Sequence, residues 1–203
     1  MSNRFYSIFV LCCVLAGCVT KEIPPDAIYT ISPEWESSRN QVEREEKNPL
    51  VIKVAPIHAI RALTGTEILY SDARYALNSY VYSRWSDAPV RLLQILIQVA
   101  LEENGRLGAV TPPTSASKAD LLLESTLFDF SHHIKENGTS DGVVRIRFYL
   151  VDNVTKIVIA TKEFASRVPA SSQDAQGAAT ALNKAATNVA RKLISWLAVP
   201  GRF

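Results

Sequence analysis

The chain has 203 residues, which corresponds to about one or two domains at roughly 150 residues per domain. It is 47% hydrophobic and 21% charged with a formal net charge of +2, a composition typical of globular proteins rather than disordered or fibrous ones. A nucleic-acid-binding domain normally carries a clear basic excess, so this balance argues against nucleic acid as a partner. All three cysteines, Cys12, Cys13 and Cys18, lie near the N-terminus, which argues against a disulfide framework, a zinc cage or a cysteine-protease site.

The N-terminus has the pattern of an export signal. Arg4 provides a positive charge, and residues 5–15 are apolar apart from Tyr6 and Ser7. This run is too short to cross a bilayer, which needs about 20 apolar residues, but it has the length of the apolar region of a signal peptide. The segment ends in Leu15-Ala16-Gly17-Cys18, which resembles the bacterial lipobox at all four positions.

The lipobox resemblance implies that residues 1–17 are removed and that Cys18 carries diacylglycerol and an N-acyl chain, with no other cofactor. Val19 stands where an Asp would retain a lipoprotein at the inner membrane, so the resemblance implies an anchor in the outer membrane, facing the periplasm. Residues 18–27 then form the lipidated cysteine and a tether, and residues 28–203 form the domain. The alternative is an ordinary signal peptide followed by an incidental cysteine.

The first half of the domain contains several short β-prone runs. Strands are predicted at residues 28–31, 50–57, 67–71 and 77–84, with Pro56 at an edge or a bulge. The charged segment 34–47 is interpreted as a solvated helix or loop. Asp87 is the expected N-cap of a helix that ends at Asn104-Gly105, and its apolar residues recur at helical spacing: Leu92, Leu93, Leu96, Val99 and Ala100.

The second half reads as three long strands and a closing helix. Residues 119–131 have apolar side chains on both faces and predict a central strand, while residues 143–151 alternate and predict a half-buried one. Residues 156–168 are the expected hairpin partner, and residues 172–198 predict a long helix with a buried apolar stripe. The predicted fold is a single α+β domain, a largely antiparallel sheet with two long helices packed on one face.

The residues for most catalytic chemistry are missing. The chain has three histidines, His58, His132 and His133, and no Gly-rich phosphate loop. His132 and His133 are adjacent in a predicted strand, so their side chains point in opposite directions and cannot chelate one metal ion from one face. The chain is therefore not expected to be an enzyme, and an envelope hydrolase would need a catalytic triad that is not visible here.

Aromatic residues cluster just before the first predicted helix. Tyr75, Tyr80, Tyr82 and Trp85 lie within eleven residues, and Tyr80 and Tyr82 share a face if this segment is extended. One interpretation is packing in the core or at a sheet edge. The other is a partner-binding patch formed by Tyr80, Tyr82 and Trp85, because Tyr and Trp combine apolar area with a polar tip.

The order of short motifs along the chain resembles the ABC-type transport auxiliary lipoproteins, of the paraquat-inducible protein C type. The resemblance rests on the lipobox, residues 28–31, the run Val51-Ile52-Lys53-Val54-Ala55-Pro56, residues 80–89, Ala119-Asp120-Leu121, Leu182-Asn183 and Trp196-Leu197. It implies a non-enzymatic, outer-membrane-anchored subunit of an envelope-spanning system that moves lipids or other hydrophobic cargo. The implied partners are an ABC permease and a mammalian-cell-entry (MCE) domain protein.

Other readings stay open at this point. A lipoprotein cofactor of cell-wall synthesis or of outer-membrane assembly is also small, anchored and α+β. The domain could instead hold lipid in an apolar groove of its own, and it could form a homo-oligomer.

Overall fold

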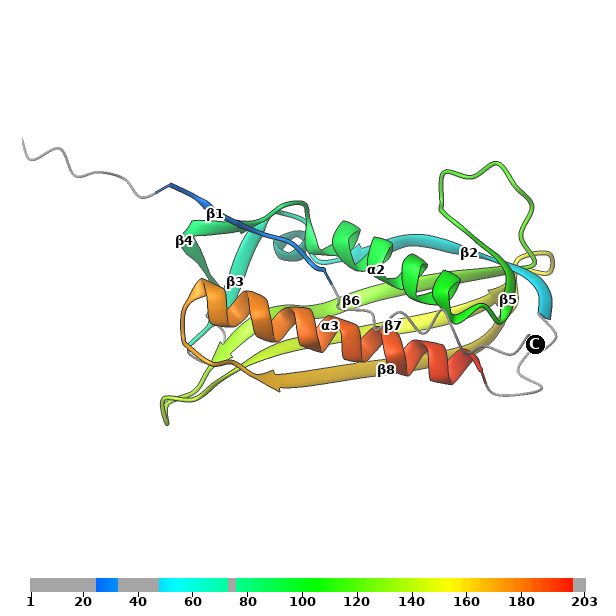
Figure 1. The fold of residues 1–203 in the computed structure, drawn as a ribbon. Coiled ribbons are helices and arrows are strands. Elements are labelled where there is room, and N and C mark those ends of the chain that lie inside the picture. The colour runs from blue at the N-terminus through cyan, green and yellow to red at the C-terminus, as the bar shows by residue number, and fades with distance from the viewer. Residues whose placement is uncertain (1–24, 33–47, 73–75, 199–203) are drawn as a thin grey trace, which may run out of the picture.

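The computed structural model describes residues 25–32, 48–72 and 76–198 (Figure 1). The predicted signal peptide, Cys18, most of the predicted tether, Tyr75 and the charged segment 34–47 lie outside these residues. The described elements are strands β1 (Ala27–Tyr29), β2 (Asn48–Ala59), β3 (Glu67–Ser71), β4 (Asn78–Trp85), β5 (Leu107–Thr111), β6 (Leu121–Ile134), β7 (Ser140–Asp152) and β8 (Val158–Pro169), helices α2 (Pro89–Asn104) and α3 (Ala175–Leu197), and the short 3-10 helix η2 (Arg61–Leu63).

Strand β6 is the spine of the sheet. One edge pairs along its whole length with β7, which in turn pairs with β8. The other edge is shared, because β2 pairs with residues 121–127 and β3 pairs with His132 and His133. The sheet therefore forks, with β5 continuing it beyond β2, and β4 and β1 continuing it beyond β3.

The strand pairing is mixed. The longest registers, β6 with β7 and β7 with β8, are antiparallel, as is β3 with β4. Among the described strands, β1 with β4 and the contacts of β2 with β5, β2 with β6 and β3 with β6 are parallel. The register of β2 shifts between Val54 and Ile57, around the Pro56 at which an edge or a bulge was predicted, and the strand continues to Ala59.

Both helices lie on one face of the sheet, as Figure 1 shows. Small side chains let α3 approach β7 closely: a Cβ added to Gly142 would lie 2.7 Å from the backbone carbon of Ala181. The buried stripe of α3 includes Leu182, Val189 and Leu193, and these side chains join the strand residues in one core. The predicted α+β single domain with two helices on one face is confirmed.

The ends of α2 differ in how well they were predicted. Gly105 adopts a left-handed conformation, with φ at 68°, and closes the helix as expected. The predicted N-cap is wrong: Ala88 occupies that position without a side-chain cap. The Asp87 carboxylate instead accepts a hydrogen bond from the Ala88 amide at 2.7 Å and pairs with Arg91 at 2.9 Å, because Pro89 starts the helix one residue later.

The sheet face opposite the helices carries alternating polar side chains. Arg145 and Arg147 lie over the Phe128 ring, with guanidinium-to-centroid distances of 5.0 and 5.1 Å. Glu163 on β8 contacts both arginines, at 3.6 and 2.7 Å. These contacts cover the aromatic ring, and β7 is half-buried, as its alternation predicted.

Candidate functional site

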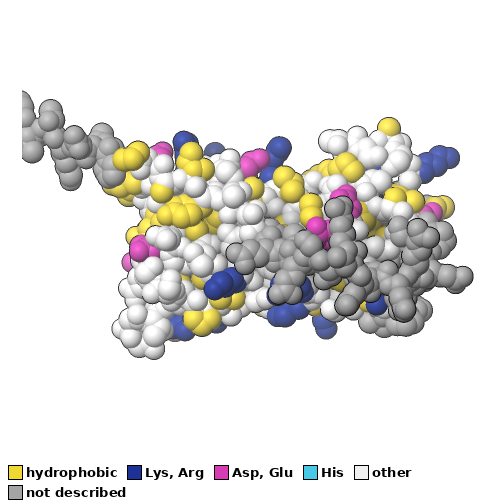
Figure 2. Space-filling model, viewed as in Figure 1, with side chains coloured by type: hydrophobic (Ala, Val, Ile, Leu, Met, Phe, Trp, Pro, Cys, Tyr) yellow, Lys and Arg dark blue, Asp and Glu magenta, His cyan; other side chains and the backbone are white. Residues whose placement is uncertain are grey.

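The described chain enters the fold beside a group of exposed apolar side chains. Strand β1 pairs in parallel with β4, with Ala27 opposite Ser83. Val81 and Tyr82 directly precede the residues of β4 that pair with β1. Figure 2 shows apolar side chains gathered at this end of the molecule. We call three of them the anchor-end patch; their exposed fractions are 60% for Ile28, 80% for Val81 and 43% for Tyr82.

The predicted aromatic patch is divided between surface and core. Trp85 is only 1% exposed and meets Phe130 edge to face, with ring centroids 5.4 Å apart. This placement corrects the expected docking role of Trp85, because the buried indole presents no surface to a partner. Tyr80 is half-buried, and only Tyr82 remains largely exposed.

Tyr80 belongs to a buried polar pair. Its hydroxyl lies 2.8 Å from Nδ1 of His132, which is fully buried, and 3.3 Å from the carbonyl oxygen of Gln173. The donor in the short contact depends on the tautomer of the ring, because the single tyrosine hydrogen can go either to Nδ1 or to the Gln173 carbonyl; the other ring nitrogen is Nε2. That nitrogen has no hydrogen-bond partner among the described residues.

The protonation states of this pair follow from burial. Desolvation, with a smaller contribution from Asp174, raises the pKa of Tyr80 to about 12. Desolvation also lowers the pKa of His132, and the neighbouring His133 adds to that effect. Both groups are therefore neutral near pH 7, and the pair joins β4, β6 and the start of α3 rather than transferring protons.

The second histidine of the pair lies on the opposite sheet face, as predicted. His133 Nε2 lies 2.9 Å from Oδ2 of Asp129, and Ser131 Oγ donates to Oδ1 of the same carboxylate at 2.6 Å. In a serine-hydrolase triad the imidazole stands between the hydroxyl and the carboxylate and accepts the hydroxyl proton. Here the carboxylate is in the middle, so this arrangement cannot activate Ser131.

The described residues contain neither a metal-binding cluster nor a membrane-spanning helix. Residues 25–32, 48–72 and 76–198 contain no group of three or more His, Cys, Asp or Glu side chains that could hold a metal ion. None of the helices described is long and apolar enough to span a membrane.

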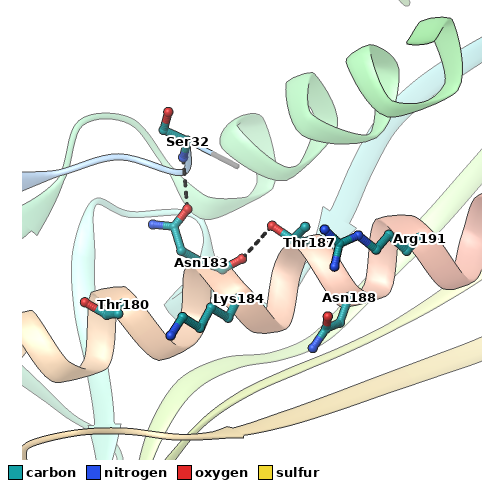
Figure 3. A pocket seen from close by; sticks show the side chains of 7 residues that line it. All are labelled: Ser32, Thr180, Asn183, Lys184, Thr187, Asn188 and Arg191. Carbon is teal, nitrogen blue, oxygen red and sulfur yellow. Dashed lines mark hydrogen bonds between the residues drawn. The ribbon is translucent and has the colours of Figure 1, made fainter. Parts of the chain in front are cut away.

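Asn183 on α3 binds the backbone that follows β1. Its amide oxygen accepts from the Ser32 amide at 2.9 Å, and its amide nitrogen donates to the Thr30 carbonyl at 2.8 Å. Figure 3 shows this contact beside a polar groove of about 380 Å³ along α3, lined by Ser32, Thr180, Asn183, Lys184, Thr187, Asn188 and Arg191. The sequence motif Leu182-Asn183 did not identify Asn183 as a contact residue. The signal that could have done so is an amide side chain next to the stripe of small residues on the predicted helix.

A second apolar group lies at the β7–β8 turn. Asp152 begins the turn and accepts hydrogen bonds from the amides of Val154 and Thr155 at 2.9 and 2.8 Å, and these bonds lower its pKa. The turn is thus well ordered, yet it exposes branched apolar side chains where polar ones are usual. We call these residues the hairpin tip; Val154 is 81%, Ile157 64% and Val158 51% exposed. The sequence signal was apolar residues within a predicted turn.

One cleft at the fork of the sheet is small and mixed in character. It has a volume of about 270 Å³, and its lining combines apolar side chains with polar ones: Ile60, Leu63, Leu77, Phe128, Asp129, Ser131 and His133. Small-molecule sites typically have volumes of about 300–1,000 Å³. This cleft therefore gives no support to the idea that the domain encloses a lipid.

Solved structures share this fold. The protein XCC0632 from Xanthomonas campestris, of family DUF330, has a TM-score of 0.69 and 21% identity, covering 85% of this chain and 92% of its own. The protein CT253 from Chlamydia trachomatis has a TM-score of 0.53 and 10% identity, covering 73% and 95%. At such identities the similarity establishes the fold alone. No curated protein matches the sequence significantly.

The sequence also matches a family description over most of its length. The matched family is the ABC-type transport auxiliary lipoprotein component, and the match covers residues 29–193. This range includes every described strand and helix in part or in full, from β1 to α3. The chain therefore belongs to the ABC-type transport auxiliary lipoprotein family.

Proposed function

We propose that this protein is a non-enzymatic auxiliary subunit of an ABC-type system that moves lipids or other hydrophobic molecules between the two membranes of the cell envelope. Cys18 carries the lipid anchor in the outer membrane, and the domain faces the periplasm. Its partners are an MCE-domain protein and the ABC permease of the same system. The observation that carries this proposal is the family match over residues 29–193, together with a sequence in residues 1–18 that resembles an export signal ending in a lipobox.

The site geometry favours binding over catalysis. Tyr80 and His132 are both neutral and tied into the fold, and the Ser131, Asp129 and His133 contacts have the wrong order for a hydrolase. The described surface offers exposed apolar side chains instead, among them the anchor-end patch and the hairpin tip; Ile60, Leu77 and Ile95 are exposed elsewhere. Exposed apolar groups of this kind are typical of interaction surfaces.

We assign the partner contact to the hairpin tip. Leu121 of β6 pairs with Asp152 at the tip, whereas His132 pairs with Tyr70 of β3 near β4 and β1. At about 3.3 Å per strand residue, the hairpin tip lies roughly 35 Å along β6 from the anchor end. The tip is therefore the part of the described surface best placed to reach a protein that spans the periplasm.

The test is recovery of partners with the lipidated protein from detergent-solubilised envelopes. The proposal predicts co-purification of an MCE-domain protein and a permease, and loss of both with Val154→Asp at the hairpin tip. The equally exposed Val81→Asp at the anchor end is the matched control and should retain them. Recovery of a cell-wall synthase or an outer-membrane assembly factor in their place would contradict the proposal.

The anchor is tested separately by metabolic labelling with a fatty-acid probe. Wild-type protein should incorporate the label, because the Cys18 thiol is the site of thioether attachment, and Cys18→Ser should not. Equal labelling of the two proteins would exclude Cys18 as the anchor.

A further inference from the structure

The anchor-end patch lies where the lipid tether enters the fold. The described chain starts at Pro25, and β1 pairs with β4 from Ala27 opposite Ser83 to Tyr29 opposite Trp85, directly after Val81 and Tyr82 in β4. Cys18 is seven residues earlier in the chain. Even fully extended, seven residues span about 25 Å, so Pro25 stays within that distance of the lipidated residue, and Ile28 of the patch follows only three residues later.

The composition of the patch suits the boundary between lipid and water. Ile28 and Val81 contribute exposed branched side chains, and Tyr82 contributes a ring with a polar hydroxyl. Apolar side chains enter the headgroup region, and Tyr is enriched there because its ring and hydroxyl match the two sides of that boundary. Arg84, on the same strand, is about half exposed and pairs with Asp26 at 3.6 Å, which places a guanidinium next to the patch.

Either a protein partner or the lipid bilayer could cover such a patch, and the short tether favours the bilayer. A protein partner would have to enter the space of about 25 Å between the domain and the bilayer. The bilayer is already there, at a high effective concentration set by the short tether. The hairpin tip has comparable exposure but lies at the opposite end of β6, so it has no such neighbour.

We propose that Ile28, Val81 and Tyr82 form a membrane-contact surface that rests on the lipid bilayer holding the anchor, so that the domain docks on the membrane by its β1–β4 end. This inference rests on the lipid anchor of the proposed function. It adds that the orientation of the domain is set by side chains as well as by the tether. The sheet then extends away from the membrane, with the hairpin tip at its far end.

The chain offers a clean labelling strategy, because its three cysteines are Cys12, Cys13 and Cys18. In the mature lipidated protein none of them is a free thiol, so a single introduced cysteine takes a fluorophore uniquely. Val81→Cys and Val154→Cys are matched, since the two valines are 80% and 81% exposed. Each labelled protein, with its lipid verified by mass, is reconstituted into phosphatidylethanolamine–phosphatidylglycerol vesicles that contain a lipid-borne quencher.

The proposal predicts strong quenching of the probe at position 81 and little at position 154. Adding Ile28→Asp to the position-81 protein should lower the quenching about threefold, which is the effect of losing part of one buried branched side chain. The control Lys162→Asp, on the exposed part of β8, should leave the quenching unchanged. Circular dichroism of all variants checks that they are folded.

Equal weak quenching at both positions, in protein whose lipid on Cys18 is verified by mass, would overturn the proposal. Cross-linking of position 81 to a protein in envelopes would also overturn it, by making the patch a protein interface. The proposed function fails in a different way, through loss of the MCE-domain protein from pull-downs. Failure of one inference is therefore distinguishable from failure of the other.

Discussion

At the scale of single residues, the fold commits two polar side chains to its interior. His132 is fully buried, and its pKa is lowered by desolvation and by His133, against smaller opposing effects of Asp174 and Asp141. Tyr80 is its hydrogen-bond partner and also stays neutral. A buried polar group that is only partly satisfied costs stability, so this pair contributes specificity of packing more than free energy.

The lowered pKa of His132 predicts a pH dependence of stability. Below the ordinary histidine pKa of about 6.5 the unfolded chain binds a proton that the folded chain resists, so the free energy of unfolding falls as the pH drops. Urea unfolding between pH 7.5 and 5.5 should show this loss, and His132→Gln should reduce the slope. The exposed His58→Gln is the control and should keep the wild-type slope; identical slopes in all three proteins would contradict the explanation.

Trp85 provides a second prediction at this scale. Because it is buried against Phe130, Trp85→Ala should lower the free energy of unfolding by about 3–5 kcal/mol. Trp85→Phe should cost less than half as much, because it keeps an aromatic ring and removes an indole N–H without a partner among the described residues. Tyr82→Ala should stay within about 0.5 kcal/mol. An unchanged free energy of unfolding in Trp85→Ala would contradict the burial of Trp85 in the core.

At the scale of elements, β1 is three residues long and depends on tertiary contacts for its position. It gains a ladder with β4, an ion pair between Asp26 and Arg84, and the clamp of Asn183 on the two backbone groups that follow it. Short strands rarely persist without such support. Asn183 thus connects the N-terminal segment to α3.

Removal of the clamp should loosen β1 locally. Asn183→Ala removes two backbone hydrogen bonds, each worth about 0.5–1.5 kcal/mol, so the Ser32 amide should exchange its hydrogen several-fold faster. Hydrogen exchange followed by NMR measures this rate. Asn188→Ala is the control, because that amide makes only a 3.4 Å contact to Ser166. Unchanged protection of Ser32 in Asn183→Ala would show that the clamp carries no stability.

The elements also show which features could be read from the sequence. Alternation and helical spacing identified β6, β7, β8, α2 and α3, because burial of one face imposes a period that survives in any context. Strand direction was not readable: β2 and β3 both run parallel to β6, a consequence of the fork, and alternation is the same in either direction. Pro56 was located correctly because a proline can be accommodated in a sheet only at an edge or bulge.

The candidate site was less predictable for the same reason. The exposure of Tyr82 and the burial of Trp85 depend on a register shift between β3 and β4, where Glu67 pairs with Arg84 but Leu69 pairs with Ser79. No local pattern reports such an irregularity. The hairpin tip and the anchor-end patch likewise became visible only when the topology placed them at opposite ends of β6.

At the scale of the whole molecule, the domain has exposed apolar side chains at two opposite ends. The N-terminal tether enters beside the anchor-end patch, and the hairpin tip lies at the far end of the longest strands. The edge strand β8 runs between these ends and has two features that hinder pairing with another strand. Its register with β7 shifts, because Leu150 pairs with Ala160 but Val151 pairs with Val158. Lys192 also donates to the carbonyl of Ala165 at 2.7 Å. Bulges and lysines of this kind discourage unwanted strand pairing, so specific contacts are left to the ends.

Site-specific cross-linking in cells tests whether the domain contacts the bilayer through its anchor-end patch and a protein partner through its hairpin tip. A photo-reactive residue is placed at position 154 or at position 81, and the cross-linked products are identified by mass spectrometry. The arrangement predicts that position 154 captures the MCE-domain protein of the transport system and that position 81 captures no protein. Capture of that protein from position 81, with none from position 154, would contradict it.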